Sequence, residues 1–203
     1  MCSRFEMSWT KRDLENLREI LAQFSAPSMP WPKEDPVGPQ DYAPSEVLPI
    51  FTPQGFVPMR WGFPMGTKRI INGRAESLLK KPFFRSLWGE GRCLIPATRF
   101  YEWHRERPYA IHLKDSLLFM AGLFRPMPPC DRGPTGEFII LTQEASPPMN
   151  RIHSRMPVLV PRHALKDYLR EEAIAESFNP FLGEGSALII EPLHGEQLSF
   201  FDV

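Results

Sequence analysis

The sequence predicts an α+β fold with a strongly bent antiparallel sheet or open β-barrel core and a few peripheral helices. Its 203 residues suffice for one domain, and an apolar content of 42% suffices for a buried core. Runs with strand character are short and numerous, and many of the 23 prolines lie between them. These runs do not alternate with helices, so the βαβ pattern of a parallel sheet is absent.

The first expected element is an amphipathic helix over Thr10–Phe24. Apolar residues recur on one stripe of this helix, namely Leu14, Leu17, Leu21 and Phe24. Thr10 and Asp13 have the spacing of an N-terminal capping pair. A proline-rich connection is expected from Ser25 to Ser45.

Nine later runs are expected to be strands, because β-branched and aromatic residues are concentrated in them and turn residues bound them. They are Val47–Phe51, Gly55–Gly62, Arg92–Ile95, Arg99–His104, Tyr109–Leu113, Leu117–Phe124, Glu137–Thr142, Met156–Val160 and Ala187–Glu191. Helices are expected at three further places, which are Ala75–Lys81, Pro161–Glu171 and Ala173–Ser177.

Charge is unevenly distributed along the chain. Lys plus Arg and Asp plus Glu number 24 each, and a net charge of zero argues at first against a polyanion-binding protein. Residues 60–107, however, hold eleven basic and four acidic groups, whereas residues 171–203 hold seven acidic groups and no Lys or Arg. A basic stretch that also contains aromatic residues favours a nucleic-acid partner.

Membrane, disulfide and metal chemistry are not expected. The longest apolar runs, such as Leu117–Phe124, are far shorter than the roughly 20 residues of a membrane span. The start of the chain lacks a secretory signal, so we expect a soluble intracellular protein. Cys2, Cys93 and Cys130 are spaced for neither a disulfide framework nor a zinc finger, which favours reduced thiols. The histidines show no ligand spacing, so we expect no metal and no cofactor.

Cys2 is a candidate nucleophile because a small second residue normally allows removal of the initiator Met1. An α-amine with a pKa of about 7.8 and a thiol with a pKa of about 8.5 would then lie on adjacent carbons. An aldehyde that meets this pair forms a Schiff base, which the sulfur can close into a thiazolidine ring. Amide hydrolysis is the other use of an N-terminal nucleophile. The alternative is that Cys2 is only a small residue near a flexible start.

Glu102 and His153 are candidate acid–base groups. Glu102 lies among aromatic residues and shares a strand face with Phe100, so its pKa is expected to be raised; alternatively it faces outward. His153 precedes an apolar strand, where it would shuttle a proton or contact a phosphate, unless it is an ordinary loop histidine.

Two further motifs offer groups for binding. Asn72 can present an amide and Arg74 can bind a phosphate, with Gly73 between them allowing close approach, although Asn-Gly is also a common turn pair. Trp61 beside Arg60 has the composition of a platform for single-stranded nucleic acid, whereas tryptophan in a strand is more often in the core.

Taken together and in order, these motifs resemble the SRAP family, the SOS response-associated peptidases, which are also called abasic site processing proteins. Nine matching blocks span about residues 1–191, and we expect those residues to form one SRAP domain. The blocks begin at Met1, Tyr42, Arg60, Asn72, Arg92, Phe100, Ala121, Leu141 and His153. Departures such as Ser3, where the family usually has glycine, leave every reactive group in place.

The resemblance implies a DNA-damage enzyme that binds single-stranded DNA and crosslinks itself to the aldehyde of an abasic site. By that resemblance, Cys2 supplies amine and thiol, and Asn72 holds the N-terminus and the sugar. Glu102 would assist release of Met1 and proton transfers, and His153 would promote opening of the sugar. The DNA groove would be lined by Arg4, Pro44, Trp61, Arg74 and Arg155. Autoproteolytic and lyase-type activities, a monomeric state and a bacterial-type, nucleoid-associated cytoplasmic location are also expected.

Two other functions remain open: a cysteine peptidase that acts on other proteins through Cys2, His153 and Asn72, and a non-catalytic binder of single-stranded DNA. The sequence shows no oxyanion hole or peptide cleft for the peptidase.

The tail over residues 192–203 carries a separate hypothesis. It resembles the short peptide by which bacterial proteins dock on the replication sliding clamp, through Gln197, Leu198, Phe200 and Phe201. The alternative is that Leu198 and Phe200 pack back on the domain.

Overall fold

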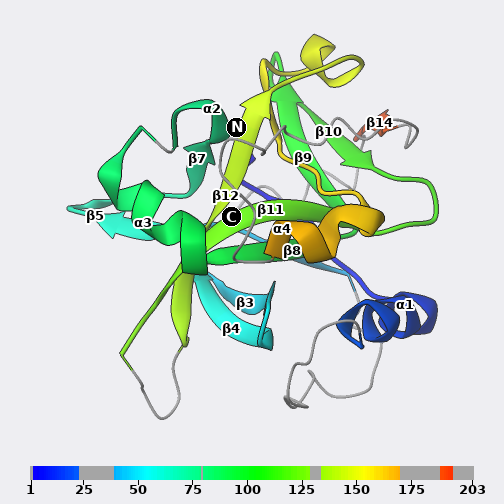
Figure 1. Ribbon diagram of the computed structural model, residues 1–203. Coiled ribbons are helices and arrows are strands. Elements are labelled where there is room, and N and C mark those ends of the chain that lie inside the picture. The colour runs from blue at the N-terminus through cyan, green and yellow to red at the C-terminus, as the bar shows by residue number, and fades with distance from the viewer. Residues whose placement is uncertain (1, 23–38, 79, 129–133, 170–187, 194–203) are drawn as a thin grey trace.

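The computed structural model describes residues 2–22, 39–78, 80–128, 134–169 and 188–193 (Figure 1). One of its sheets has five strands in the order β14-β10-β9-β1-β2, and all of its pairings are antiparallel. Its strands are β1 (Phe5–Met7), β2 (Gln40–Tyr42), β9 (Arg99–His104), β10 (Arg107–His112) and β14 (Ile189–Pro192). The N-terminal strand β1 is therefore an interior strand, held between β9 and β2.

A second sheet of seven strands closes on itself. Its path runs β11-β8-β3-β4-β12, and β12 pairs again with β11, while β7 and β13 attach to β12. Its strands are β3 (Val47–Thr52), β4 (Gly55–Trp61), β7 (Asn72–Arg74), β8 (Arg92–Ala97), β11 (Leu118–Pro126), β12 (Gly136–Glu144) and β13 (Arg155–Pro157). The predicted α+β class with a barrel-like core is thus confirmed.

The sheet was predicted to be antiparallel, and this is wrong for β12, which runs parallel to both β4 and β7. Both partners lie far earlier in the chain than β12, and a connection of that length allows strands to run in the same direction. A short third sheet consists of the hairpin of β5 (Phe63–Met65) and β6 (Lys68–Ile70).

Short helices surround the sheets (Figure 1): α1 (Lys11–Leu21), α2 (Ala75–Leu78), α3 (Pro82–Glu90), the 3-10 turns Met149–Arg151 and Arg162–Ala164, and α4 (Leu165–Leu169). The predicted capping pair is confirmed: the Asp13 amide donates to Thr10 Oγ1 at 3.2 Å, and the Thr10 amide donates to Asp13 Oδ2 at 3.0 Å. The expected helix Ala173–Ser177 lies outside the described residues. In the part of the chain that is described, no helix is long and apolar enough to cross a membrane.

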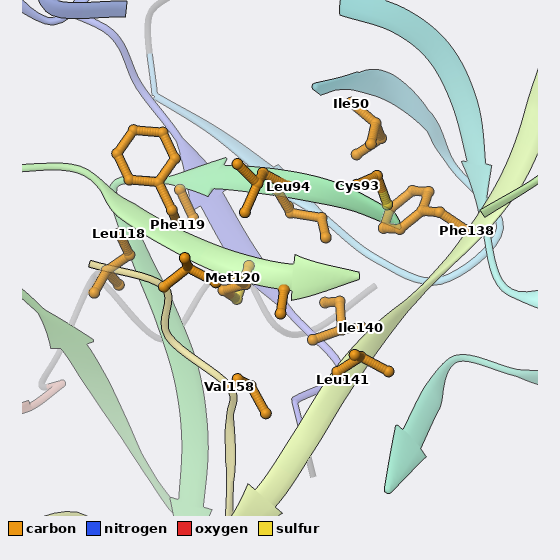
Figure 2. Packing of buried hydrophobic residues seen from close by; sticks show 14 of the residues in the cluster. Ile50, Cys93, Leu94, Leu118, Phe119, Met120, Phe138, Ile140, Leu141 and Val158 are labelled. Atoms are coloured by element: carbon orange, nitrogen blue, oxygen red, sulfur yellow. The ribbon is translucent and has the colours of Figure 1, made fainter. Parts of the chain in front are cut away.

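The core lies between the strands of the closed sheet. Figure 2 shows side chains from β8, β11 and β12 meeting there, and Leu94, Met120 and Ile140 are among those with no exposed surface. Cys93 is also buried in this cluster, and Cys2 and Cys93 are free thiols, as predicted for these two cysteines. Cys130 lies outside the described residues.

Candidate functional site

Strand β1 fixes the start of the chain inside the domain. Phe5 pairs with Tyr42 on one side and with Phe100 on the other, and its side chain is fully buried. The Tyr101 amide donates to the Arg4 carbonyl at 3.0 Å, which continues the pairing toward Cys2. Cys2 itself has no exposed surface. A residue this close to a chain end is ordinarily loosely held, so its burial here depends on the two flanking strands.

Asn72 holds the backbone of Cys2. Its Nδ2 donates a hydrogen bond of 2.8 Å to the Cys2 carbonyl, across 70 residues of sequence. Strand β7 places Asn72 by pairing with β12, where Asn72 lies opposite Ile140. Among the described residues, Asn72 Oδ1 is buried without a hydrogen-bond partner.

Gly73 explains why β7 can lie so close to β12. A Cβ at this position would lie 2.9 Å from Leu78 Cδ1 and 3.1 Å from Ile139 Cδ1, closer than side chains normally pack. Glycine therefore lets the Asn72 backbone approach the sheet.

Glu102 brings a carboxyl group into the same buried region. It lies on β9 opposite Tyr109 and is 2% exposed, so of the two alternatives it is buried and does not face outward. Burial raises its pKa above the ordinary range, against the opposing attraction of the positive chain terminus and of His153. The pKa of the Cys2 thiol is raised as well, by burial first and then by the charge of Glu102. Glu102 thus interacts electrostatically with Cys2 and with His153, and burial favours the neutral form of the thiol.

The backbone of Arg155 orients His153. The Arg155 amide donates to His153 Nδ1 at 2.9 Å, and the Arg155 carbonyl lies 3.1 Å from the same ring nitrogen. A neutral ring can accept from this amide, and a protonated ring can donate to this carbonyl. One residue therefore contacts this ring nitrogen with both a donor and an acceptor group.

Arg155 is held by a carboxylate that the sequence reading did not single out. Its Nη1 donates to Glu76 Oε1 at 2.6 Å and its Nη2 to Glu76 Oε2 at 2.9 Å, and Nη2 also donates to the Thr142 carbonyl at 2.7 Å. These hydrogen bonds are the main reason that the pKa of Glu76 falls to about 2. Glu76 does stand in the motif Asn72–Glu76, in the first turn of a helix, and that position was the available signal.

The other residues predicted to contact DNA differ in their exposure to solvent. Arg74 is exposed at the end of β7, and Arg4 and Pro44 are half-buried. Trp61 requires a correction: it has no exposed surface, packs on Phe5 at a centroid distance of 5.0 Å, and donates from Nε1 to the Ile71 carbonyl. It cannot serve as a surface stacking platform in this structure, because β4 directs its ring into the core.

Part of the basic stretch over residues 60–107 is engaged in contacts within the protein. Arg92 is 1% exposed and lies over the Trp88 ring at 5.4 Å, and Arg69 pairs with Glu137 at 3.2 Å. The charges left at the surface of this stretch include Lys68, Arg74, Lys80, Lys81, Arg85, Arg105 and Arg107. Within the described residues, no group of three His, Cys, Asp or Glu side chains could hold a metal ion.

The site therefore combines a cysteine at position 2, an amide on its carbonyl, a buried carboxyl group and an oriented imidazole. A thiol, an amide, a carboxyl group and an imidazole are groups suited to nucleophilic and acid–base chemistry. The model of the family described as SOS response associated peptidase (SRAP) matches residues 1–197, and the chain belongs to this family.

Curated relatives and solved structures agree with that assignment. The chain is 28% identical to abasic site processing protein YedK of Escherichia coli, over 91% of this chain and 86% of that protein. It is 32% identical to abasic site processing protein YoaM of Bacillus subtilis, over 83% of this chain and 79% of that protein. A crystal structure of a protein from Bacteroides thetaiotaomicron shares the fold, with a TM-score of 0.74 and 21% identity, covering 98% of this chain and 94% of that one.

Proposed function

We propose that this protein processes abasic sites in single-stranded DNA by capturing their aldehyde covalently on Cys2, once Met1 has been removed. The observation that carries the proposal is the 2.8 Å hydrogen bond from Asn72 to the Cys2 carbonyl, in a site that also contains the buried Glu102 carboxyl group. The names of the curated relatives support the same substrate.

The reaction balances with the groups present. The ring-opened sugar presents an aldehyde carbon, and the Cys2 α-amine adds to it to give a carbinolamine. Loss of water leaves an imine, and the Cys2 sulfur then adds to the imine carbon while the thiol proton passes to nitrogen. The product is a thiazolidine ring, and one water is released.

Three side chains of the site have roles in this reaction. Glu102, whose raised pKa lets it retain a proton at a higher pH than an ordinary carboxyl group, donates to the departing hydroxyl and accepts a proton from the amine. His153 assists opening of the sugar by exchanging a proton with its hydroxyl and ring oxygen. Asn72 fixes the position of the nucleophile, which is an entropic contribution to the rate.

Phosphate contacts come from the exposed Arg74 and from Arg4 and Arg155, with Pro44 beside them. Because the chain carries no net charge and part of the basic stretch is paired internally, non-specific affinity is modest and covalent capture supplies the selectivity. Autocatalytic or aminopeptidase removal of Met1, a lyase-type release, a role in the SOS response and a cytoplasmic, nucleoid-associated location belong to the same proposal. Docking of the tail on a sliding clamp stays a prediction, since residues 194–203 lie outside the described part.

The test is incubation with single-stranded DNA that carries one abasic site, followed by a denaturing gel. We expect a denaturation-resistant adduct that Cys2→Ala and a variant retaining Met1 both fail to form. Cys2→Ala and Cys2→Ser both keep the amine, so each should give an adduct only when borohydride reduces the imine. Cys93→Ala removes the other described thiol and should still react.

Three results would contradict the proposal. Cleavage of a peptide substrate without a DNA adduct would favour the peptidase. Binding that is unaffected by Cys2→Ala, with no covalent product from the wild type, would indicate a non-catalytic binder. An adduct that survives Cys2→Ala without borohydride would place the nucleophile elsewhere.

A further inference from the structure

One carboxylate connects the two segments that carry Asn72 and His153. Glu76 lies in α2, directly after the strand that carries Asn72, and its Oε1 accepts a hydrogen bond of 2.9 Å from the Glu144 amide at the end of β12. The same side chain accepts both Nη groups of Arg155, which lies 79 residues further along the chain. Glu76 therefore joins α2, β12 and β13.

The connection continues to the imidazole. Arg155 also donates from Nη2 to the Thr142 carbonyl at 2.7 Å, so its guanidinium is fixed at two points besides the backbone pairing of β13 with β12. The backbone amide and carbonyl of this same arginine lie at 2.9 and 3.1 Å from His153 Nδ1. The guanidinium contacts and the pairing of β13 with β12 thus act together to hold the backbone groups that orient the ring.

We propose that Glu76 is a positioning residue for the reaction: through Arg155 it sets the orientation of His153 relative to Asn72 and Cys2. This inference rests on the proposed function. It also changes the role of Arg155, since a guanidinium bound by a carboxylate at 2.6 and 2.9 Å has part of its charge and hydrogen-bonding capacity already engaged.

Opposite effects on binding and on rate follow from this arrangement. The Glu76 side chain is about half exposed, so its negative charge lies beside the surface that would receive phosphates. Replacing it by glutamine removes that repulsion and releases Arg155, so DNA binding should be unchanged or tighter. The bidentate hold on Arg155 is lost at the same time, so His153 is less well oriented and the covalent step should slow.

The experiment measures single-turnover adduct formation over a range of abasic-DNA concentrations, which separates the maximum rate from the half-saturating concentration. For Glu76→Gln we expect a maximum rate lower by about 10- to 100-fold, the range of a small misplacement of a reacting group. The half-saturating concentration should not rise. Glu90→Gln is the matched control, because it removes an equal charge from an exposed residue of α3 and should leave the maximum rate unchanged.

Arg155→Lys provides an independent variant, since it keeps the positive charge and loses the two-pronged contact. It should slow the maximum rate to a similar extent, and the double variant with Glu76→Gln should be no slower than either single one, because both act through one connection. Circular dichroism and thermal unfolding establish that each variant is folded at the assay temperature.

The outcomes separate the two proposals. No adduct from the wild type refutes the proposed function. An adduct from the wild type together with an unchanged maximum rate for folded Glu76→Gln refutes the positioning role. A defect of Glu76→Gln that appears only as a raised half-saturating concentration also refutes it, and so do fully additive effects in the double variant.

Discussion

Replacing Asn72 tests how much the rate of covalent capture depends on the hydrogen bond that holds the Cys2 backbone. Asn72→Ala removes the donor of the 2.8 Å hydrogen bond and leaves the Cys2 carbonyl without that partner. A polar group buried without its partner costs about 1–3 kcal/mol. If the same interaction holds the nucleophile in the transition state, the rate of adduct formation falls by about 5- to 150-fold, since roughly 1.4 kcal/mol corresponds to a factor of ten.

Asn72→Asp sharpens this test because it keeps the shape of the side chain. At neutral pH its carboxylate would face the Cys2 carbonyl with an acceptor in place of a donor, and it would add a negative charge to the region of Glu102. We therefore expect Asn72→Asp to react more slowly than Asn72→Ala at neutral pH. Its rate should recover in part as the pH falls, because a protonated carboxyl group can donate again.

The assay is single-turnover adduct formation on abasic single-stranded DNA, with binding to DNA that carries a reduced, aldehyde-free abasic analogue as the control. Binding should change little in Asn72→Ala, which separates positioning of the nucleophile from affinity. A wild-type rate in Asn72→Ala would refute the reasoning. An aspartate variant that reacts faster than the alanine variant at neutral pH would refute it as well.

Four further predictions follow from the described contacts. Because burial raises the pKa of Glu102, the unfolded chain releases this proton at a lower pH than the folded one, so the free energy of unfolding falls as pH rises from about 4.3. In urea unfolding, Glu102→Gln should therefore gain stability relative to the wild type between pH 4 and pH 8. Parallel pH profiles of the two proteins would contradict this. Trp61→Ala should lower the free energy of unfolding by about 3–5 kcal/mol, since the ring has no exposed surface; an unchanged stability with weakened DNA binding would restore the stacking role. Arg74→Ala should lower the slope of log affinity against log salt by about one, measured by fluorescence anisotropy, and an unchanged slope would remove Arg74 from the DNA surface. Removal of residues 194–203 should abolish pull-down of the sliding clamp while adduct formation persists, and undiminished pull-down would exclude the tail as a docking peptide.

Local pattern predicted the strands in which β-branched and aromatic residues are concentrated between turn residues. The bounds of β9 were predicted as the structure has them, Arg99–His104, and this strand carries Glu102. Cysteine at position 2 could be identified as a candidate nucleophile because that chemistry depends on its place in the chain. These features need no knowledge of distant partners.

Features that depend on distant partners could not be predicted in the same way. The parallel pairing of β12 with β7 and the hold of Glu76 on Arg155 join segments whose separation in sequence gives no local signal. The burial of Trp61 was left open because a strand residue beside an arginine fits both a core and a surface. Helix α3 was missed because its phenylalanines obscure helical spacing, although Pro82 occupies its first turn.

The interior position of β1 makes reactivity a property of the assembled domain. Cys2 is buried only while β9 and β2 flank the strand that follows it, and Asn72 reaches its carbonyl only while β7 lies on β12. An extension fused ahead of Cys2 would have to leave a fully enclosed position. Adduct yield would report the fraction of molecules in which β1 is in place between β9 and β2.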